Sequence, residues 1–246
     1  MVLKDAFANL SIPSNIQGKF GLHEGKFDPQ KVKFLVYGES GVGKTVFSST
    51  WIDPVFLDID LGMASIKREV HRFEIRTWSD LVSATEFLAN ETHPFKTVVL
   101  DSLNELQHLS MGNVVDSYPT IRRSYDSLPS ISDYGKMLDD FDKMLRFLKS
   151  LDMNVVFIAQ VAERQNDTDP ALPQLIGKSS ARNLARMMDV IGFLDKRESS
   201  EGAKKRFMVF DAVNFVTKDR SDLLPQQVED PTYDKLLKFW LQESRR

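Results

Sequence analysis

The segment that decides the fold is Gly38-Glu39-Ser40-Gly41-Val42-Gly43-Lys44-Thr45. It follows the spacing G-x-x-x-x-G-K-[ST] and stands between an apolar run at 34–37 and a helical pattern at 46–51. Glycines let such a loop wrap phosphate groups with its backbone N–H groups, while Lys44 adds a positive charge and Thr45 offers a hydroxyl to Mg²⁺. The segment therefore predicts a phosphate-binding loop for ATP and Mg²⁺.

Short apolar runs on both sides of this loop predict a sheet. Continuous apolar runs bounded by turn residues are typical of parallel strands that are buried on both faces. These runs are 34–37, 55–57, 97–100, 155–159 and 190–194. Helical patterns alternate with them, including 133–151 and a helix expected to begin with Ser79 as its N-cap. The alternation predicts an α/β fold with a mostly parallel central sheet flanked by helices.

The two ends of the chain differ from this pattern. Residues 1–30 contain scattered Gly and Pro without periodicity, and we interpret them as an N-terminal arm and a possible oligomerisation tether; an arm without fixed structure is the alternative. Residues 31–225 form the expected core. The charged stretch 196–205 and the strand-like 207–216 predict an antiparallel edge near the C-terminus, and 226–246 contains an amphipathic helix at 233–241.

Composition limits the class of protein. Hydrophobic residues make up 42% and charged residues 27% of the 246 residues, as in an ordinary globular domain. No apolar run reaches the roughly 18 residues of a membrane span, and a secretory signal and cysteine are both missing, so we expect a cytoplasmic protein without disulfides. The net charge of -3 gives no general attraction for nucleic acid, so any such binding needs local basic loops.

Carboxylates follow two of the predicted strands. Asp101 ends the run 97–100, where a second ligand for Mg²⁺ is expected; a cap on the following helix is the alternative. Asp58 and Asp60 follow the run 55–57 and share one face by strand alternation. A carboxylate here could orient the attacking water, and the alternative is a pair of solvated turn residues.

With these residues in place, the chain resembles the RecA-type ATPases, and among them the phage nucleotide-binding proteins that include Sak-type single-strand annealing ATPases. The resemblance covers about 32–220 and rests on the phosphate-binding loop and on 56–60, 98–102 and 157–160. It implies a RecA-like fold, Asp60 as the catalytic carboxylate and Gln160 as the γ-phosphate sensor. RecA has glutamate at the Asp60 position and many phage relatives have histidine at the Gln160 position, so slow hydrolysis is expected. A strand-end residue satisfied by backbone is the alternative for Gln160.

The resemblance also implies two DNA-binding segments, near 117–132 and 162–180. Arginine suits phosphate contacts and tyrosine suits base stacking. The residues expected to bind single-stranded DNA are Tyr118, Arg122, Arg123, Tyr125, Arg164, Lys178, Arg182 and Arg186. Acidic neighbours such as Asp126 and Glu163 dilute the positive charge, so solvated loops are the alternative.

A last pair of cations, Lys218 and Arg220, resembles the Lys-x-Arg finger that reaches the nucleotide of a neighbouring subunit. The resemblance therefore implies a homo-oligomer with shared active sites. A surface ion pair with Asp219 or Asp222 is the alternative.

Together these features predict an ATP-hydrolysing recombination protein that binds single-stranded DNA and promotes annealing or strand pairing. A single-strand binding or annealing protein is a possible partner, and the location would be the host cytoplasm for a phage protein. Two alternatives stay open because the loop occurs in many chemistries. One is an ATPase that acts as a protein assembly or regulatory factor without binding DNA, and the other is a small-molecule kinase.

Overall fold

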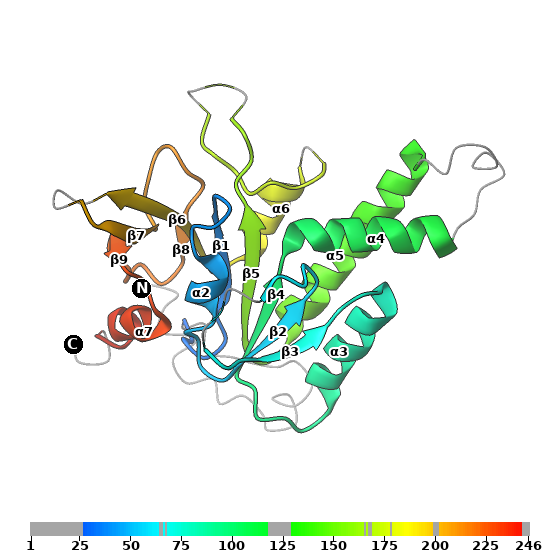
Figure 1. Cartoon of the computed structure of the whole chain (residues 1–246), viewed down its shortest axis with the longest axis horizontal. Helices are drawn as coiled ribbons and strands as arrows, with labels where there is room; N and C mark the ends of the chain where they lie inside the picture. Colours follow the sequence, from blue (N-terminus) through cyan, green and yellow to red (C-terminus); the bar gives the residue numbers. More distant parts are fainter. Residues whose placement is uncertain are drawn as a thin grey trace, which may run out of the picture.

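The computed structural model describes residues 27–242, apart from 64, 65, 67, 118–128, 165, 167, 168, 178 and 199–201. The described chain forms an open sheet with helices on both faces (Figure 1). The predicted α/β fold class is confirmed.

Within these ranges, nine strands form one sheet in the order β3-β2-β4-β5-β1-β6-β7-β9, and β8 pairs with β6. The parallel part consists of β3 (His71–Glu74), β2 (Pro54–Asp58), β4 (Thr97–Asp101), β5 (Asn154–Gln160), β1 (Lys33–Gly38) and β6 (Val190–Glu198). The antiparallel part adds β7 (Lys204–Val209), β8 (Lys218–Asp219) and β9 (Gln227–Glu229). The antiparallel edge expected near the C-terminus is therefore present.

The helices are α2 (Lys44–Ser48), α3 (Trp78–Asn90), α4 (Leu103–Ser117), α5 (Ile131–Ser150), α6 (Ser180–Met187) and α7 (Tyr233–Leu241). The prediction of Ser79 as the N-cap of α3 is wrong. Thr77 is the N-cap, because its hydroxyl accepts from the Asp80 backbone N–H while the Asp80 carboxylate accepts from the Thr77 N–H. This reciprocal pair satisfies two N–H groups that the first turn leaves without helical partners.

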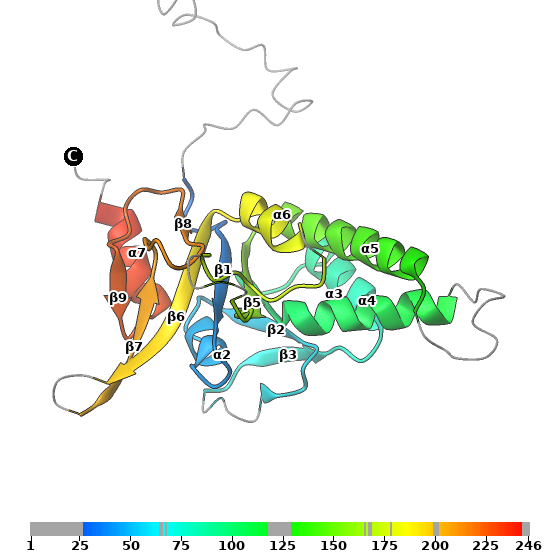
Figure 2. The same cartoon turned by 90° about the horizontal axis from the view of Figure 1, so that it is seen from above.

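The continuous apolar strands are explained by burial on both faces of the sheet. In β1, Leu35 and Tyr37 belong to one core cluster, whereas Phe34 and Val36 belong to the other. Helices α3, α4, α5 and α6 cover the first cluster, and α2 and α7 cover the second. Figure 2 shows α5 and α6 on one side of the sheet and α2 on the other.

Strand β9 and helix α7, the last two elements, are part of the same core. Strand β9 extends the sheet, and α7 buries Tyr233, Leu236 and Trp240 in the second cluster. None of the helices in the described ranges combines the length and hydropathy needed to cross a bilayer.

Candidate functional site

The phosphate-binding loop connects the end of β1 to the start of α2, so it lies at the carboxyl edge of the parallel strands. Two of its glycines are required by geometry. A Cβ on Gly38 would lie 2.2 Å from the Leu194 carbonyl oxygen on β6, and Gly43 has a φ of 106°, in the left-handed region. The first backbone N–H groups of a helix have no helical partner, so those after Gly43 are available to phosphate.

Lys44 is buried, with 6% of its surface exposed, and its side chain crosses the loop. The Nζ atom donates to the carbonyl oxygens of Gly38 (2.9 Å) and Glu39 (2.8 Å) and to Gln160 Oε1 (3.0 Å). Burial lowers the pKa of Lys44 to about 8, against the opposing effect of the Asp101 and Glu39 charges. A bound anion would stabilise the charged form of this buried lysine.

Thr45 and Asp101 form the other half of the site. The Thr45 hydroxyl donates to Asp101 Oδ2 at 2.9 Å, which favours the Mg²⁺ role over the helix cap for Asp101. Burial raises the pKa of Asp101 to about 6; the Thr45 hydrogen bond opposes this shift and the charges of Asp60 and Asp58 add to it. A hydroxyl and a carboxylate, completed by phosphate oxygens and water, are a fitting donor set for Mg²⁺.

The raised pKa of Asp101 predicts that Asp101→Asn stabilises the nucleotide-free protein near pH 7.5. The stability contributed by the protonated carboxyl is present in full below pH 3.8 and is lost as the pH rises through about 6. That interval corresponds to at most about 3 kcal/mol, at about 1.4 kcal/mol per pKa unit. Urea unfolding of both proteins at about pH 4.5 and about pH 7.5 measures the difference. A difference that does not grow with pH would contradict the prediction.

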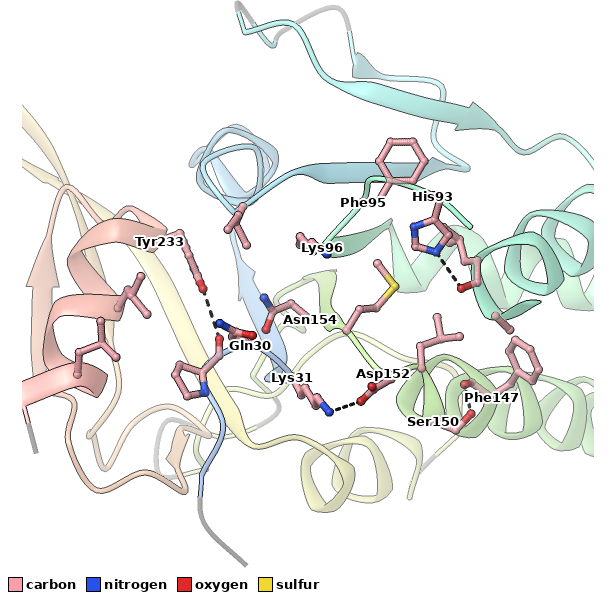
Figure 3. A pocket seen from close by; sticks show the side chains of 18 residues that line it. Gln30, Lys31, His93, Phe95, Lys96, Phe147, Ser150, Asp152, Asn154 and Tyr233 are labelled. Carbon is pink, nitrogen blue, oxygen red and sulfur yellow. Dashed lines mark hydrogen bonds and ion pairs between the residues drawn. The ribbon is translucent and has the colours of Figure 1, made fainter. Parts of the chain in front are cut away.

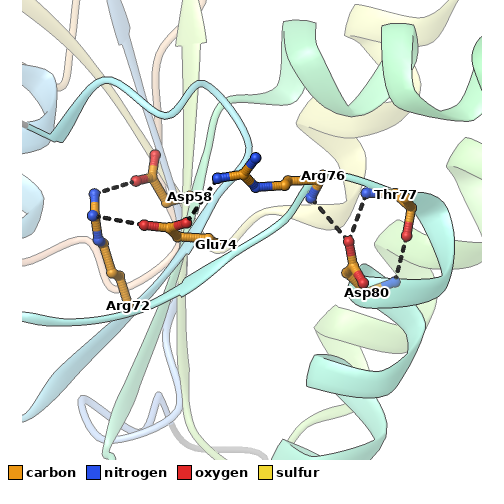
Figure 4. A network of polar contacts seen from close by, with 6 residues as sticks. All are labelled: Asp58, Arg72, Glu74, Arg76, Thr77 and Asp80. Atoms are coloured by element: carbon orange, nitrogen blue, oxygen red, sulfur yellow. Dashed lines mark hydrogen bonds and ion pairs between the residues drawn. The ribbon is translucent and has the colours of Figure 1, made fainter.

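Asp58 and Asp60 have separate environments. Asp58 is 1% exposed and its Oδ2 pairs with Arg72 Nη1 at 3.0 Å, in a network that Glu74 and Arg76 extend (Figure 4). The alternative of a solvated turn residue is therefore wrong for Asp58. Among the described residues its Oδ1 atom is buried without a hydrogen-bond partner.

Asp60 lies beyond the end of β2 and is exposed. The backbone N–H groups of Ile59 and Asp60 both donate to the Asp101 carbonyl, so the chain turns toward β4 here. Its charge contributes to the raised pKa of Asp101. Of the two carboxylates, Asp60 is thus the one placed beside the predicted Mg²⁺ site and accessible to water.

Gln160 ends β5 directly opposite Gly38 in the register of β1 and β5. Its side chain accepts from Lys44, so it is not a strand-end residue satisfied by backbone. Its backbone N–H donates to Asn104 Oδ1 at 3.1 Å, and Asn104 Nδ2 donates to the Gln174 carbonyl at 2.8 Å. Sequence reasoning missed Asn104, whose one signal is its position three residues after Asp101.

Part of the predicted DNA-binding set can be placed. Tyr118, Arg122, Arg123, Tyr125 and Lys178 lie outside the described residues. Within the described part, Arg164, Arg182 and Arg186 line one cavity of about 840 Å³, together with Glu163 and Asp169.

These arginines differ in how firmly they are held. Arg164 donates to the Asn214 carbonyl at 3.2 Å and lies 5.3 Å from the centre of the Phe215 ring. Arg182 and Arg186 are exposed, four residues apart on α6. Their spacing puts both on one face of the helix, where they could contact successive phosphates.

Lys218 and Arg220 do not lie at the phosphate-binding loop of the same chain; they contact residues at and just after the end of α6. Lys218 Nζ donates to the carbonyl oxygens of Ala185 (3.1 Å) and Met188 (2.5 Å), at the end of α6. Arg220 forms an ion pair with Asp189 at 2.8 Å. The Asp189 carboxylate also accepts from the Lys33 backbone N–H at the start of β1. Asp189 thus replaces Asp219 and Asp222 as the ion-pair partner of Arg220. A role for these cations in a neighbouring subunit stays a prediction.

A second cavity, of about 760 Å³, is shown in Figure 3. It lies near the start of β1 and β5, whereas the phosphate-binding loop follows the end of β1. Its lining includes Lys31, paired with Asp152, and Asn154 at the start of β5. His93 Nε2 contacts the Leu88 carbonyl at 3.0 Å in its wall. Because the strands separate this cavity from Lys44, it is not part of the phosphate site.

The strand order, the loop after β1 and the Thr45–Asp101 pair define a P-loop nucleoside triphosphatase core of the RecA-like type. A family model described as "AAA domain" matches residues 30–221, and the chain belongs to that family. No curated protein matches it.

Several solved structures are similar at low identity. One is a structure of a DnaB-like replicative helicase and its interactions with primase. It is 14% identical with a TM-score of 0.45, over 81% of this chain and 55% of that one. A KaiC-like protein from Pyrococcus horikoshii OT3 is 13% identical with a TM-score of 0.41, over 73% and 79%. The flagellar accessory protein FlaH from Methanocaldococcus jannaschii is 10% identical with a TM-score of 0.42, over 87% and 89%. This chain thus spans about half the length of the helicase chain.

Proposed function

We propose that the chain hydrolyses ATP with Mg²⁺, binds single-stranded DNA and promotes annealing or strand pairing. The observation that carries the ATPase part is that Lys44 bonds to Gln160 and Thr45 bonds to Asp101. Lys44 and Asp101 are buried, and the four residues come from the start of α2 and the ends of β4 and β5. Bound Mg²⁺ would neutralise charge on the phosphates. Rates with and without single-stranded DNA test the two parts separately.

Four residues at the loop have separate roles in the proposed hydrolysis. Lys44, already desolvated, stabilises the charge that grows on the transferred phosphoryl group. Thr45 and Asp101 hold the cation beside it. Asp60 is the exposed carboxylate that orients the attacking water and accepts its proton. The Asp60 side chain is one methylene shorter than glutamate, so turnover is expected to be slow.

A continuous chain of hydrogen bonds joins this site to the segment proposed to bind DNA. Gln160 contacts Lys44 through its side chain, and its backbone carbonyl accepts from the Gln174 N–H at 2.8 Å. Asn104 contacts both Gln160 and Gln174. Gln174 also lines the cavity that contains Arg164, Arg182 and Arg186. A shift of the Lys44 side chain on nucleotide binding can therefore be transmitted to that cavity. This connection supports stimulation of hydrolysis by DNA.

The DNA part predicts that the double variant Arg182→Ala and Arg186→Ala binds single strands more weakly. Each lost phosphate contact should flatten the log–log salt dependence by about 0.7, hence about 1.4 for two. Anisotropy of a labelled oligothymidylate at several salt concentrations measures this. The matched control is Lys143→Ala with Arg146→Ala, which removes two exposed cations from α5 outside the cavity.

Equal loss of affinity in both double variants would reduce the effect to net charge. If the parent protein does not bind single-stranded DNA, the DNA part of the proposal is excluded. The alternative of a protein assembly or regulatory ATPase is then favoured, in agreement with the net charge of -3. Arg122 and Arg123 stay predicted contacts of the same surface, and Lys218 and Arg220 stay predicted contributors to a shared site in a homo-oligomer.

A further inference from the structure

A small hollow of about 190 Å³ adjoins the phosphate-binding loop on the side of the antiparallel strands. Half of its lining comes from the loop, α2 and the turn just after α2, and half comes from the C-terminal part of the chain. The lining residues are Gly43, Val46, Phe47, Thr50, Arg206, Asp230, Pro231 and Thr232. Because Gly43 belongs to both features, the hollow and the phosphate-binding loop are direct neighbours.

The order of strands fixes which end of a nucleotide faces the hollow. Asp101 and Gln160 end β4 and β5, on one side of β1. Arg206 belongs to β7 and Asp230 follows β9, on the other side of β1. A triphosphate whose terminal phosphate lies near Gln160 therefore has its nucleoside end toward Arg206.

Arg206 is held in place over the loop. Its Nε donates to the Val42 carbonyl at 2.9 Å, and a Cβ on Gly43 would lie 2.6 Å from that nitrogen. Its backbone N–H donates to Asp230 Oδ1 at 3.2 Å, and its carbonyl accepts from the Asp230 N–H at 2.7 Å. Within the described residues, its terminal guanidinium nitrogens make no hydrogen bond or ion pair, so the flat face and two donors remain available.

The other walls have complementary character. Val46 is 37% exposed, an apolar surface one residue beyond Thr45. Asp230 uses Oδ1 for Arg206, and in the described chain Oδ2 has no hydrogen bond. An apolar wall, a planar cation and a carboxylate acceptor together suit an aromatic ring whose edge donates a hydrogen bond.

We propose that this hollow is the nucleobase subsite: Arg206 lies against the ring of the adenine of ATP and Asp230 accepts from its exocyclic amine. The proposal rests on the proposed ATP-binding function. Sites for whole small molecules measure about 300–1,000 Å³, so this volume suits one ring system that extends a ligand held at the loop. Arginine is well suited to the contact because its planar guanidinium stacks on aromatic faces.

Equilibrium binding of ATP and of inorganic tripolyphosphate, each with Mg²⁺, separates the base from the phosphates. The parent is expected to bind ATP at least about tenfold more tightly than tripolyphosphate. Arg206→Ala should weaken ATP binding about tenfold and leave tripolyphosphate within about twofold, because the guanidinium contacts the ring. Arg197→Ala is the matched control: it removes an arginine on the neighbouring β6 that pairs with Asp195 and does not line the hollow.

A second variant decides the proposal if Arg206→Ala does not fold. Asp230→Asn keeps an oxygen for the Arg206 N–H, and it should reduce the preference for ATP over purine riboside triphosphate, which lacks the exocyclic amine. Equal affinity of the parent for ATP and tripolyphosphate would overturn the subsite while leaving the phosphate site intact. Equal weakening of both probes by Arg206→Ala would overturn it as well, because Arg206 would then act through the loop. If the parent binds neither probe, the proposed ATPase function itself fails.

Discussion

Lys44→Ala is expected to abolish detectable ATP turnover, with a loss of at least about 10²-fold, the usual cost of removing one preorganised charge-stabilising donor. The three acceptors around Lys44 Nζ hold it at the mouth of the loop before any nucleotide arrives. The variant should still fold, with some loss of stability because the Gly38 and Glu39 carbonyl oxygens lose a donor. The lowered pKa of Lys44, about 8, shows that burial disfavours its charge, which limits that loss.

Lys33→Ala is a matched control for this variant. Lys33 is also 6% exposed, donates to the carbonyl oxygens of Leu151 and Met153, and has a pKa lowered to about 8 by burial. It lies at the opposite end of β1 from the loop. The control should lower stability, because two carbonyls lose a donor, yet leave turnover per folded molecule unchanged. Near-normal turnover by Lys44→Ala, with phosphate release as the readout, would exclude the loop as the active site.

Asp101→Asn is expected to weaken Mg²⁺-dependent ATP binding by at least about tenfold, because even indirect partners of a metal are worth about 10–100-fold in affinity. The amide keeps an oxygen for the Thr45 hydroxyl but loses the negative charge that a hard cation prefers. Binding of ATP without Mg²⁺ should persist, since Lys44 is untouched.

The control for this prediction is Asp58→Asn. Asp58 is the register partner of Asp101 on β2 and is also buried, but its carboxylate pairs with Arg72 rather than Thr45. Calorimetric Mg²⁺ titrations in the presence of ATP should therefore change for Asp101→Asn and stay close to the parent for Asp58→Asn. The same change in both variants would assign the effect to lost negative charge in general and reduce Asp101 to a structural residue.

Local patterns were sufficient for most of the architecture. The five apolar runs all lie in parallel strands, and the helix at 233–241 has the predicted bounds. These elements could be predicted because their hydrophobic pattern is contained in their own residues. The N-cap of α3 was misplaced by two residues, because Ser79 and Thr77 are both good caps and only Thr77 has an acidic residue three positions later. For the site, the loop could be predicted because one strand, one turn and one helix form it from consecutive residues. Asp101 was predicted from its place at the end of an apolar strand, and its contact with Thr45 joins residues 56 positions apart.

The sequence by itself thus determined the phosphate-binding loop, the alternation of strands and helices and the two-sided burial of the sheet. Tertiary structure alone decided that Gln160 meets Lys44, through the parallel register of β1 and β5. It also decided that Asp58 pairs with Arg72, that Lys218 meets the end of α6, and that Arg206 donates to the Val42 carbonyl. The physical reason is range: a cap or a turn is satisfied within a few residues, whereas these contacts join residues between 14 and 164 positions apart and depend on strand order.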